Sequence, residues 1–187
     1  MSTPPVTLQP ERAALVVVDI QERLLPAIFE KDRVLKNGIL LLRLAEILEL
    51  PIVLTTQYRK GLGDTVPEIL AAAPSVQAMD KLSFGCFGSQ EFTSRVEGLA
   101  GRDQLLVIGI EAHICVAQTV LGALGAGYQA HVVSDAISSR TEANWHVGLG
   151  RMERAGAVIS SAEMAIYELL ARSDSPAFKK ILPYLKG

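Results

Sequence analysis

The chain has 187 residues, of which 49% are hydrophobic and 20% are charged. This balance is typical of one globular domain with a large core, and it excludes an intrinsically disordered chain. The formal net charge is −2 and the lysines and arginines form no basic stripe, so nothing indicates a nucleic-acid partner. No apolar run approaches the roughly 20 residues of a membrane-spanning helix, so no membrane partner is expected.

The cysteines and the mean hydropathy bear on location and assembly. The chain has two cysteines, Cys86 and Cys115, and reduced thiols are more typical of such a chain than a disulfide. The amino-terminal stretch shows no pattern of a secretory signal, so we expect a cytoplasmic location. A mean hydropathy of +0.29 is high for a soluble monomer of this size. We therefore expect a homo-oligomer, a dimer or larger, that buries apolar surface between subunits.

Strand and helix patterns alternate along the chain. Apolar runs typical of buried strands cover residues 13–20, 52–57, 76–81, 104–110, 130–136 and 157–160. Helical spacing and capping signals predict a first helix that Asp32 caps and Pro51 ends, and a short helix after the glycine-bearing loop within 58–69. They also predict helices over 89–99, 116–129, 141–156 and 161–171. The last of these is expected to be capped by Ser160 or Ser161.

This alternation predicts the fold. Strands buried on both faces are typical of parallel sheets, and parallel neighbours require crossover connections. We predict a single domain over residues 1–187. Its fold class is α/β, a three-layer sandwich with a mainly parallel, six-stranded, doubly wound, Rossmann-like sheet.

Ligands of an open parallel sheet bind beyond the carboxyl ends of its strands. Polar residues stand at the ends of five predicted strands: Asp19; Thr56 and Gln57; Asp80 and Lys81; Glu111, His113 and Cys115; Ser134 and Asp135. Their convergence at one edge of the sheet predicts a site there.

Cys115 is the candidate nucleophile. In the first turn of a helix, free backbone N–H groups and the helix dipole favour a thiolate, and a lysine nearby would lower the thiol pKa further. Packing as a small hydrophobic residue is equally compatible with this position. Cys86, in "FGCFG" between Phe84 and Phe87, is expected to pack rather than react.

Asp19 and Lys81 have ordinary and functional interpretations as well. Asp19 either caps the following turn or acts as a general base, and Lys81 is either a solvated charge or an electrostatic anchor. Together with Cys115 they would supply a base, an anchor and a nucleophile at three strand ends. The combination indicates an active site more strongly than any member does alone.

These residues also carry a resemblance. "ALVVVDIQ" with Asp19, "KLSF" with Lys81 and "GIEAHICV" with Cys115 resemble the isochorismatase-like (cysteine hydrolase) superfamily over nearly the whole chain. "TTQYRKGLGDTVPE", "SSRT", "RMERAG" and "FKKI" further resemble the subgroup of isochorismatase domain-containing proteins.

The resemblance implies roles for individual residues. Asp19 would take the thiol proton, Lys81 would orient it, and Cys115 would attack a carbonyl or similar carbon to form a covalent intermediate. A non-proline cis peptide would lie between Ile110 and Glu111. The amides of Glu111 and Cys115 would then form an oxyanion hole.

The chain differs from known members of the superfamily in two respects, and both bear on the expected reaction. Nicotinamidase-like members bind a metal through histidines after the second strand, but no histidine precedes His113 in this chain. We therefore expect no catalytic metal and no cofactor. Isochorismatases that cleave a vinyl ether can lack the cysteine, whereas this chain has it, although Gln57 resembles their substrate-binding glutamine.

The sequence thus predicts a metal-independent cysteine hydrolase of a small molecule, cleaving an amide or related C–N bond. Gln57, Tyr58, Phe84 and His113 are the predicted substrate-binding residues. Tyr58 and Phe84, with Phe87, indicate an apolar or aromatic ligand. A vinyl ether hydrolase and a catalytically degenerate protein that binds a ligand or partner remain the alternatives.

Overall fold

The computed structural model describes residues 7–185; the other residues of the predicted domain, 1–6 and 186–187, lie outside the described part. Within residues 7–185, six parallel strands form one sheet in the order β3-β2-β1-β4-β5-β6. The strands are β1 (Ala13–Val18), β2 (Ile52–Gln57), β3 (Ala78–Lys81), β4 (Gln104–Ile110), β5 (Gln129–Ser138) and β6 (Val158–Ser160).

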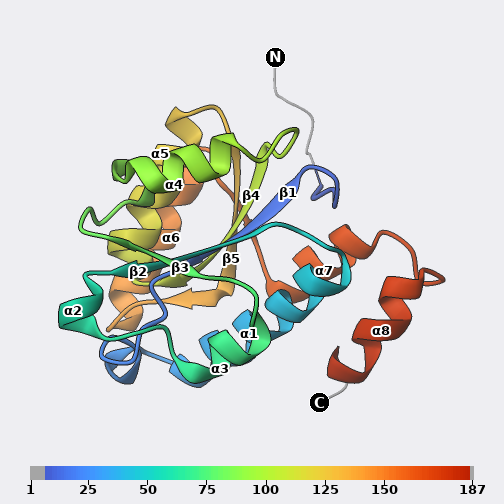
Figure 1. The fold of residues 1–187 in the computed structure, drawn as a ribbon, viewed down its shortest axis with the longest axis horizontal. Coiled ribbons are helices and arrows are strands. Elements are labelled where there is room, and N and C mark those ends of the chain that lie inside the picture. Colours follow the sequence, from blue (N-terminus) through green and yellow to red (C-terminus); the bar gives the residue numbers. More distant parts are fainter. Residues whose placement is uncertain (1–6, 186–187) are drawn as a thin grey trace.

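Helices cover both faces of the sheet (Figure 1). One layer contains α1 (Lys31–Ile47), α3 (Pro67–Ala72), α7 (Ala162–Leu170) and α8 (Pro176–Leu185). The other contains α4 (Gln90–Glu97), α5 (Ala117–Gly125) and α6 (Glu142–Arg154). The short helix α2 (Arg59–Leu62) follows β2. The predicted α/β sandwich with a doubly wound sheet is therefore confirmed.

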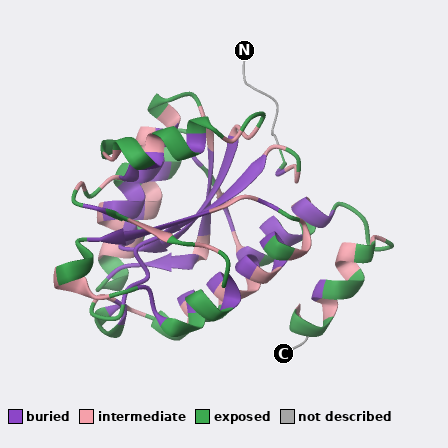
Figure 2. Ribbon diagram, in the orientation of Figure 1, coloured by how far each residue is buried: buried purple, intermediate pink, exposed green. Residues whose placement is uncertain are grey.

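The core consists of two apolar clusters, one on each face of the sheet. Every residue of the central strands β1 and β4 is buried, and Figure 2 shows the sheet as the buried centre of the molecule. The chain builds outward from β1 to β3, then returns to β4 and builds in the opposite direction. The order therefore reverses between β1 and β4, which is where such sheets bind ligands.

The fifth strand differs from its prediction. β5 continues to Ser138, so Ser134 and Asp135 lie inside the strand rather than at its end. A register shift against β4 between Val107 and Gly109 accommodates the extra residues, as a β-bulge does. The Asp135 carboxylate accepts a hydrogen bond from the backbone N–H of Ala162 at 2.7 Å, so it anchors α7.

The structure also bears on three helical regions: it gives the starts of two predicted helices and adds a third helix. α1 begins at Lys31 after Glu30, so Asp32 lies in its first turn and is not its cap. Ser161, not Ser160, caps α7 by accepting a hydrogen bond from Met164. α8 was not predicted as a helix, because Pro183 inside it masks the helical pattern. None of the helices formed by residues 7–185 has the length and apolarity to span a membrane.

Candidate active site

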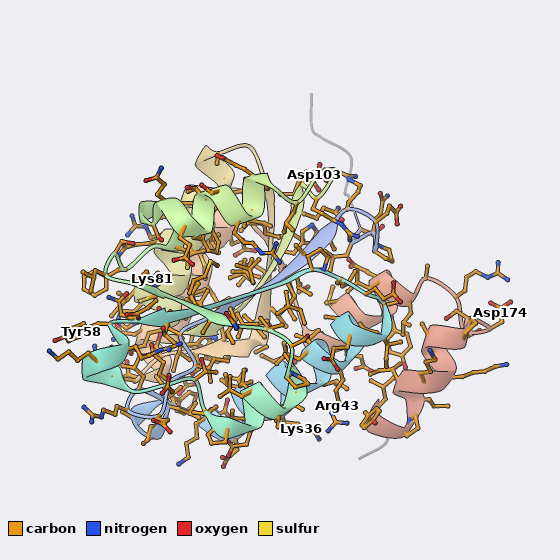
Figure 3. The ribbon with its side chains drawn as sticks, viewed as in Figure 1. Lys36, Arg43, Tyr58, Lys81, Asp103 and Asp174 are labelled. Atoms are coloured by element: carbon orange, nitrogen blue, oxygen red, sulfur yellow. The ribbon has the colours of Figure 1, made fainter. Side chains whose placement is uncertain are left out.

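Asp19 and Lys81 form a buried ion pair at the carboxyl ends of β1 and β3. Lys81 Nζ lies 2.7 Å from Asp19 Oδ2, and both side chains are at most 1% exposed. Asp19 adopts a φ of 52°, a left-handed conformation that aspartate tolerates better than most residues. Figure 3 shows Lys81 at the end of the molecule that also holds Tyr58, far from Asp103.

Lys81 is surrounded by acceptors. Besides Asp19, its Nζ donates to Gln57 Oε1 at 2.9 Å and to the carbonyl oxygens of Phe84 and Ser83 at 3.1 and 3.3 Å. The ammonium is therefore engaged by the protein and is not available to bind substrate. It holds the Asp19 carboxylate and the segment after β3 in place.

Gln57, a predicted substrate-binding residue, lies at the end of β2 and contacts Lys81. Its Oε1 accepts from Lys81, and its Nε2 donates to the carbonyl of Leu82 at 2.9 Å. The side chain of Gln21 in turn binds the backbone N–H and carbonyl of Gln57. Both ends of the Gln57 amide are thus bonded within the protein, and contact of Gln57 with substrate stays a prediction.

Thr55 is a site residue that the sequence did not indicate. Its hydroxyl donates to Asp19 Oδ1 at 2.8 Å, so both carboxylate oxygens have a donor. Thr56, named from the sequence, points the other way and donates to Asp80 Oδ1. The alternation of side chains along a strand explains the choice, because Thr55 is the neighbour of Val18 in the β1–β2 register.

The turn after β4 holds the candidate nucleophile. Gly109 has a φ of 122°, and a Cβ there would lie 2.0 Å from the carbonyl oxygen of Val18, so only glycine fits. The peptide bond between Ile110 and Glu111 is cis. Residues Ala112–Val116 then form a π-helical turn that leads into α5, and Cys115 lies in this turn.

Burial raises the pKa of the Cys115 thiol to about 12. The negative charge of Asp19 and its hydrogen bond with the thiol contribute to this rise, and Lys81 opposes it. The prediction of a lowered thiol pKa was therefore wrong. Cys115 is only 6% exposed and packs in an apolar cluster, and these effects outweigh the helix terminus and the lysine. The thiol and the carboxylate are nevertheless brought together.

Cys86 is fully buried, as the sequence indicated. Burial raises the pKa of its thiol to about 11, and its sulfur lies 3.8 Å from the Thr55 hydroxyl. Its backbone N–H donates to Thr119, whose hydroxyl donates to the carbonyl of Cys115. Cys86 thus belongs to the packing behind the site.

The predicted aromatic lining is only partly at the surface of the site. Tyr58 and Phe84 are 47% and 56% exposed; Tyr58 donates its backbone N–H to the carbonyl of Lys81, and the carbonyl of Phe84 accepts from Lys81 Nζ. Phe87 packs against Phe92 and Tyr128 and does not join them. A cavity of about 900 Å³ lies at the amino ends of β2 and β3, at the opposite end of the sheet from Asp19, Lys81 and Cys115.

The loop after β5 meets the turn that carries Cys115. His113 Nδ1 lies 2.9 Å from the Ser139 hydroxyl. The carboxylate of Glu111 accepts two hydrogen bonds from Arg140, one from its backbone N–H and one from Nε, both at 3.0 Å. Ser139 and Arg140 therefore follow the carboxyl end of β5, where the sequence had predicted Ser134 and Asp135.

Among the described side chains, no three His, Cys, Asp or Glu residues are grouped so that they could hold a metal ion. The absence of a metal requirement stays a prediction, and elemental measurement is its test.

Sequence comparison agrees with this architecture. A family model described as "Isochorismatase domain" matches residues 13–164. The chain is 38% identical over 182 residues to the secreted isochorismatase effector Isc1 of Phytophthora sojae, covering 96% of this chain and 87% of that protein. It is 34% identical over 177 residues to isochorismatase domain-containing protein 2A of Mus musculus, covering 95% and 84%.

Solved structures give the same result. The MAR1 ribonuclease of Caenorhabditis elegans superposes with a TM-score of 0.91 at 33% identity, covering 97% of this chain and 93% of that one. The YcaC gene product of Escherichia coli, described as an octameric hydrolase of unknown specificity, superposes with 0.91 at 28% identity, covering 98% and 92%. The chain belongs to the isochorismatase family and is a hydrolase of the isochorismatase-like superfamily.

Proposed function

We propose that the protein is a metal-independent cysteine hydrolase that cleaves an amide or related C–N bond of a small molecule. The observation that carries this proposal is the contact of the Cys115 thiol with Asp19, whose carboxylate also pairs with buried Lys81. A base, a nucleophile and a fixed cation thus meet at the point where the strand order reverses.

The first half of the reaction would form a thioester. Asp19 takes the thiol proton as the Cys115 sulfur attacks the carbonyl carbon, and the carbonyl oxygen becomes an oxyanion. The amides of Glu111 and Cys115 would donate to this oxyanion. Collapse of the adduct breaks the C–N bond, and the proton held by Asp19 passes to the leaving amine.

The second half would hydrolyse the thioester. Asp19, ionised again, takes a proton from a water molecule that attacks the thioester carbonyl. The C–S bond breaks, the proton returns to the sulfur, and a carboxylic acid leaves. Lys81 stays paired with the carboxylate throughout and keeps it aimed at the sulfur.

A structure of a relative supports the nucleophile. YcaC from Pseudomonas aeruginosa, with a TM-score of 0.90 and 28% identity, was solved with hexane-2,5-diol and covalent acrylamide. Acrylamide is a small amide electrophile, so that relative contains a group that forms a bond with it. In this chain Cys115, at 6% exposed, is the less buried of the two cysteines, and Cys86 is fully buried.

The alternative vinyl ether hydrolysis needs an acid that protonates the substrate. Both oxygens of Asp19 act as acceptors, one for the Thr55 hydroxyl and one for the Lys81 ammonium at 2.7 Å, so we assign this carboxyl no role as a proton donor to a vinyl ether. Ribonuclease activity is named for the Caenorhabditis elegans relative. The net charge of −2 offers no general attraction to RNA, so we give this activity second place.

A screen of small amides tests the proposal. The wild-type chain should release amine, and mass spectrometry of the acid-quenched reaction should find an acyl adduct on Cys115. Cys115→Ala should abolish turnover, and Cys86→Ala should retain it. Cleavage of RNA or a vinyl ether by Cys115→Ala at the wild-type rate would contradict the proposal. Elemental analysis of the active protein should find no stoichiometric metal, and chelation should leave its activity unchanged.

We also propose that the chain acts as a homo-oligomer in the cytoplasm. The octameric Escherichia coli relative supports self-association, as does the apolar composition. One relative is named a secreted effector, so location varies within the family and must be measured for this chain.

A further inference from the structure

Arg140 is an exposed cation at the carboxyl edge of the sheet, beside the nucleophile turn. Its side chain is 60% exposed, whereas the Glu111 side chain that it pairs with is 8% exposed. Only Nε of its guanidinium is bonded, and its two terminal nitrogens have no partner among residues 7–185. The sequence singled out "SSRT" only as a mark of resemblance, so no role has been assigned to this arginine.

The pairing fixes where the guanidinium lies. Ile110 and Ser138 are neighbours in the β4–β5 register, so the loop after β5 starts beside Glu111. Both the backbone and the side chain of Arg140 donate to one oxygen of Glu111. A guanidinium held at two points by a nearly buried carboxylate loses little further entropy when it binds a ligand.

The same contacts tie Arg140, through Glu111, to the turn that carries Cys115. The carbonyl of Glu111 accepts hydrogen bonds from Ile114 and from Val116, the residue after the nucleophile. The backbones of Glu111 and Cys115 are thus about one helical turn apart, roughly 5 Å. The start of α6 follows directly, with Thr141 as its cap, and a helix start also favours an anion.

Arg140 is suited to a role that Lys81 cannot fill. The Lys81 ammonium is buried and engaged by Asp19, Gln57 and backbone carbonyls, so it offers no donor to a ligand. Arg140 has two free nitrogens that can donate side by side to a carboxylate, the geometry in which arginine binds anions best.

We propose that Arg140 binds an anionic group of the substrate, so that the preferred substrates are small amides with a carboxylate a few atoms from the scissile carbonyl. This inference rests on the proposed function of Cys115. Glu111 is the positioning residue that holds Arg140, and the substrate carboxylate completes the guanidinium's set of acceptors.

Alkylation of Cys115 by two reagents of similar size tests the inference. Iodoacetate carries a carboxylate and iodoacetamide is neutral, and both are attacked by the same sulfur. Rates at Cys115 are measured by peptide mass mapping. In Arg140→Gln the iodoacetate rate should fall roughly tenfold, as expected for the loss of a charge-assisted hydrogen bond. The iodoacetamide rate should stay within about twofold, because a neutral reagent gains little from a guanidinium.

Matched variants separate charge from position. Arg140→Lys should retain part of the preference for iodoacetate, since it keeps the charge without the planar fork. Arg151→Gln, on helix α6 that follows Arg140, removes an exposed charge and should leave both rates unchanged. A fall of both rates together in Arg140→Gln, or of neither, would overturn the inference.

A measurement on the unmodified chain guards against misfolded variants. Malonate should protect Cys115 from iodoacetamide, and neutral malonamide at the same concentration should not. Equal protection by both would also overturn the inference. If neither reagent labels Cys115 in the wild type, the proposed function itself fails, an outcome distinct from the loss of charge preference alone.

Discussion

The thiol of Cys115 lies between two opposite charges, and the negative one has the larger effect on it. Burial raises its pKa to about 12, Asp19 adds to the rise and Lys81 counteracts it. The thiol is therefore protonated at neutral pH, and a carboxylate that can accept its proton is in contact with it. This arrangement favours proton transfer during the attack on substrate over a thiolate formed in advance.

Removal of the Asp19 charge should change alkylation and turnover in opposite directions. In Asp19→Asn the thiol loses a neighbouring negative charge and keeps Lys81, so its pKa should fall and its alkylation at pH 8 should rise roughly tenfold. Turnover should be lost, because the base is gone. In the wild type, the alkylation rate should rise about tenfold for each unit by which the pH is increased, up to a pH of about 12.

Mass-mapped alkylation with limiting iodoacetamide provides the measurement, and Cys86 provides the internal control. Cys86 is fully buried, so it should remain unlabelled although the pKa of its thiol is raised only to about 11. A wild-type rate that levels off below pH 8, or slower labelling of Asp19→Asn, would show that the carboxylate does not hold the thiol protonated.

Only some of these residues can be found from the sequence. Asp19, Lys81 and Cys115 stand at strand ends, where a polar residue after an apolar run is visible. Thr55 lies inside the run "IVLTTQ", and its role depends on the register between β1 and β2. The sign of the thiol pKa shift depends on burial and on the nearest charge, and neither is encoded by spacing along the chain.

At the scale of elements, the central strands were the easiest to predict. β2 and β4 match residues 52–57 and 104–110, because both are apolar runs with clear ends. β5 extends past a polar pair, Ser134 and Asp135, since its bulged register against β4 turns these residues toward bonding partners on helices. Such a bulge is a property of two strands together and leaves no local signal.

The junction of β4 with its turn should tolerate only glycine at residue 109. In Gly109→Ala the new Cβ would meet the Val18 carbonyl oxygen at 2.0 Å at a φ of 122°. We expect a loss of at least about 2 kcal/mol in the free energy of unfolding and a displaced Cys115 with little activity. Urea denaturation and amide turnover measure the two effects.

Gly125→Ala is the matched control. Gly125 is the last residue of α5 and a Cβ there would meet nothing within 4 Å, so the change should be neutral or stabilise the protein by about 0.5–1 kcal/mol. Equal stability of the two variants would disprove the claim that the close approach of β1 requires glycine.

The ion pair links β1 to β3 across β2, and removing one partner should destabilise this part of the sheet. Lys81→Met keeps the length of the side chain but leaves the Asp19 carboxylate buried without a cation, which costs about 3–5 kcal/mol. Adding Asp19→Asn should recover part of that loss, because no unpaired buried charge remains. Urea denaturation of the four proteins of the cycle gives the coupling. Additive effects of the two changes would exclude a stabilising pair.

At the scale of the whole molecule, the alternation of strands and helices determined the architecture. Parallel strands need crossovers, crossovers place helices on both faces, and the reversal of strand order between β1 and β4 brings Asp19 and Cys115 together. The assembly of several chains cannot be predicted in the same way, because a single chain shows only the surface through which it would associate. Exposed apolar residues near the site indicate where a second copy of the chain would bind.

Leu82, Phe84 and Tyr58 are 75%, 56% and 47% exposed, and they surround the segment that Lys81 holds. We expect a second copy of the chain to cover this patch, since burial of these side chains stabilises association. Light scattering at micromolar concentration should give a multiple of 20.1 kDa. Leu82→Ser with Phe84→Ser should shift the mass toward the monomer, whereas Val147→Ser, 64% exposed on α6, should not. A wild-type mass of one chain would refute the expectation, and an unchanged mass of the double variant would place the interface elsewhere.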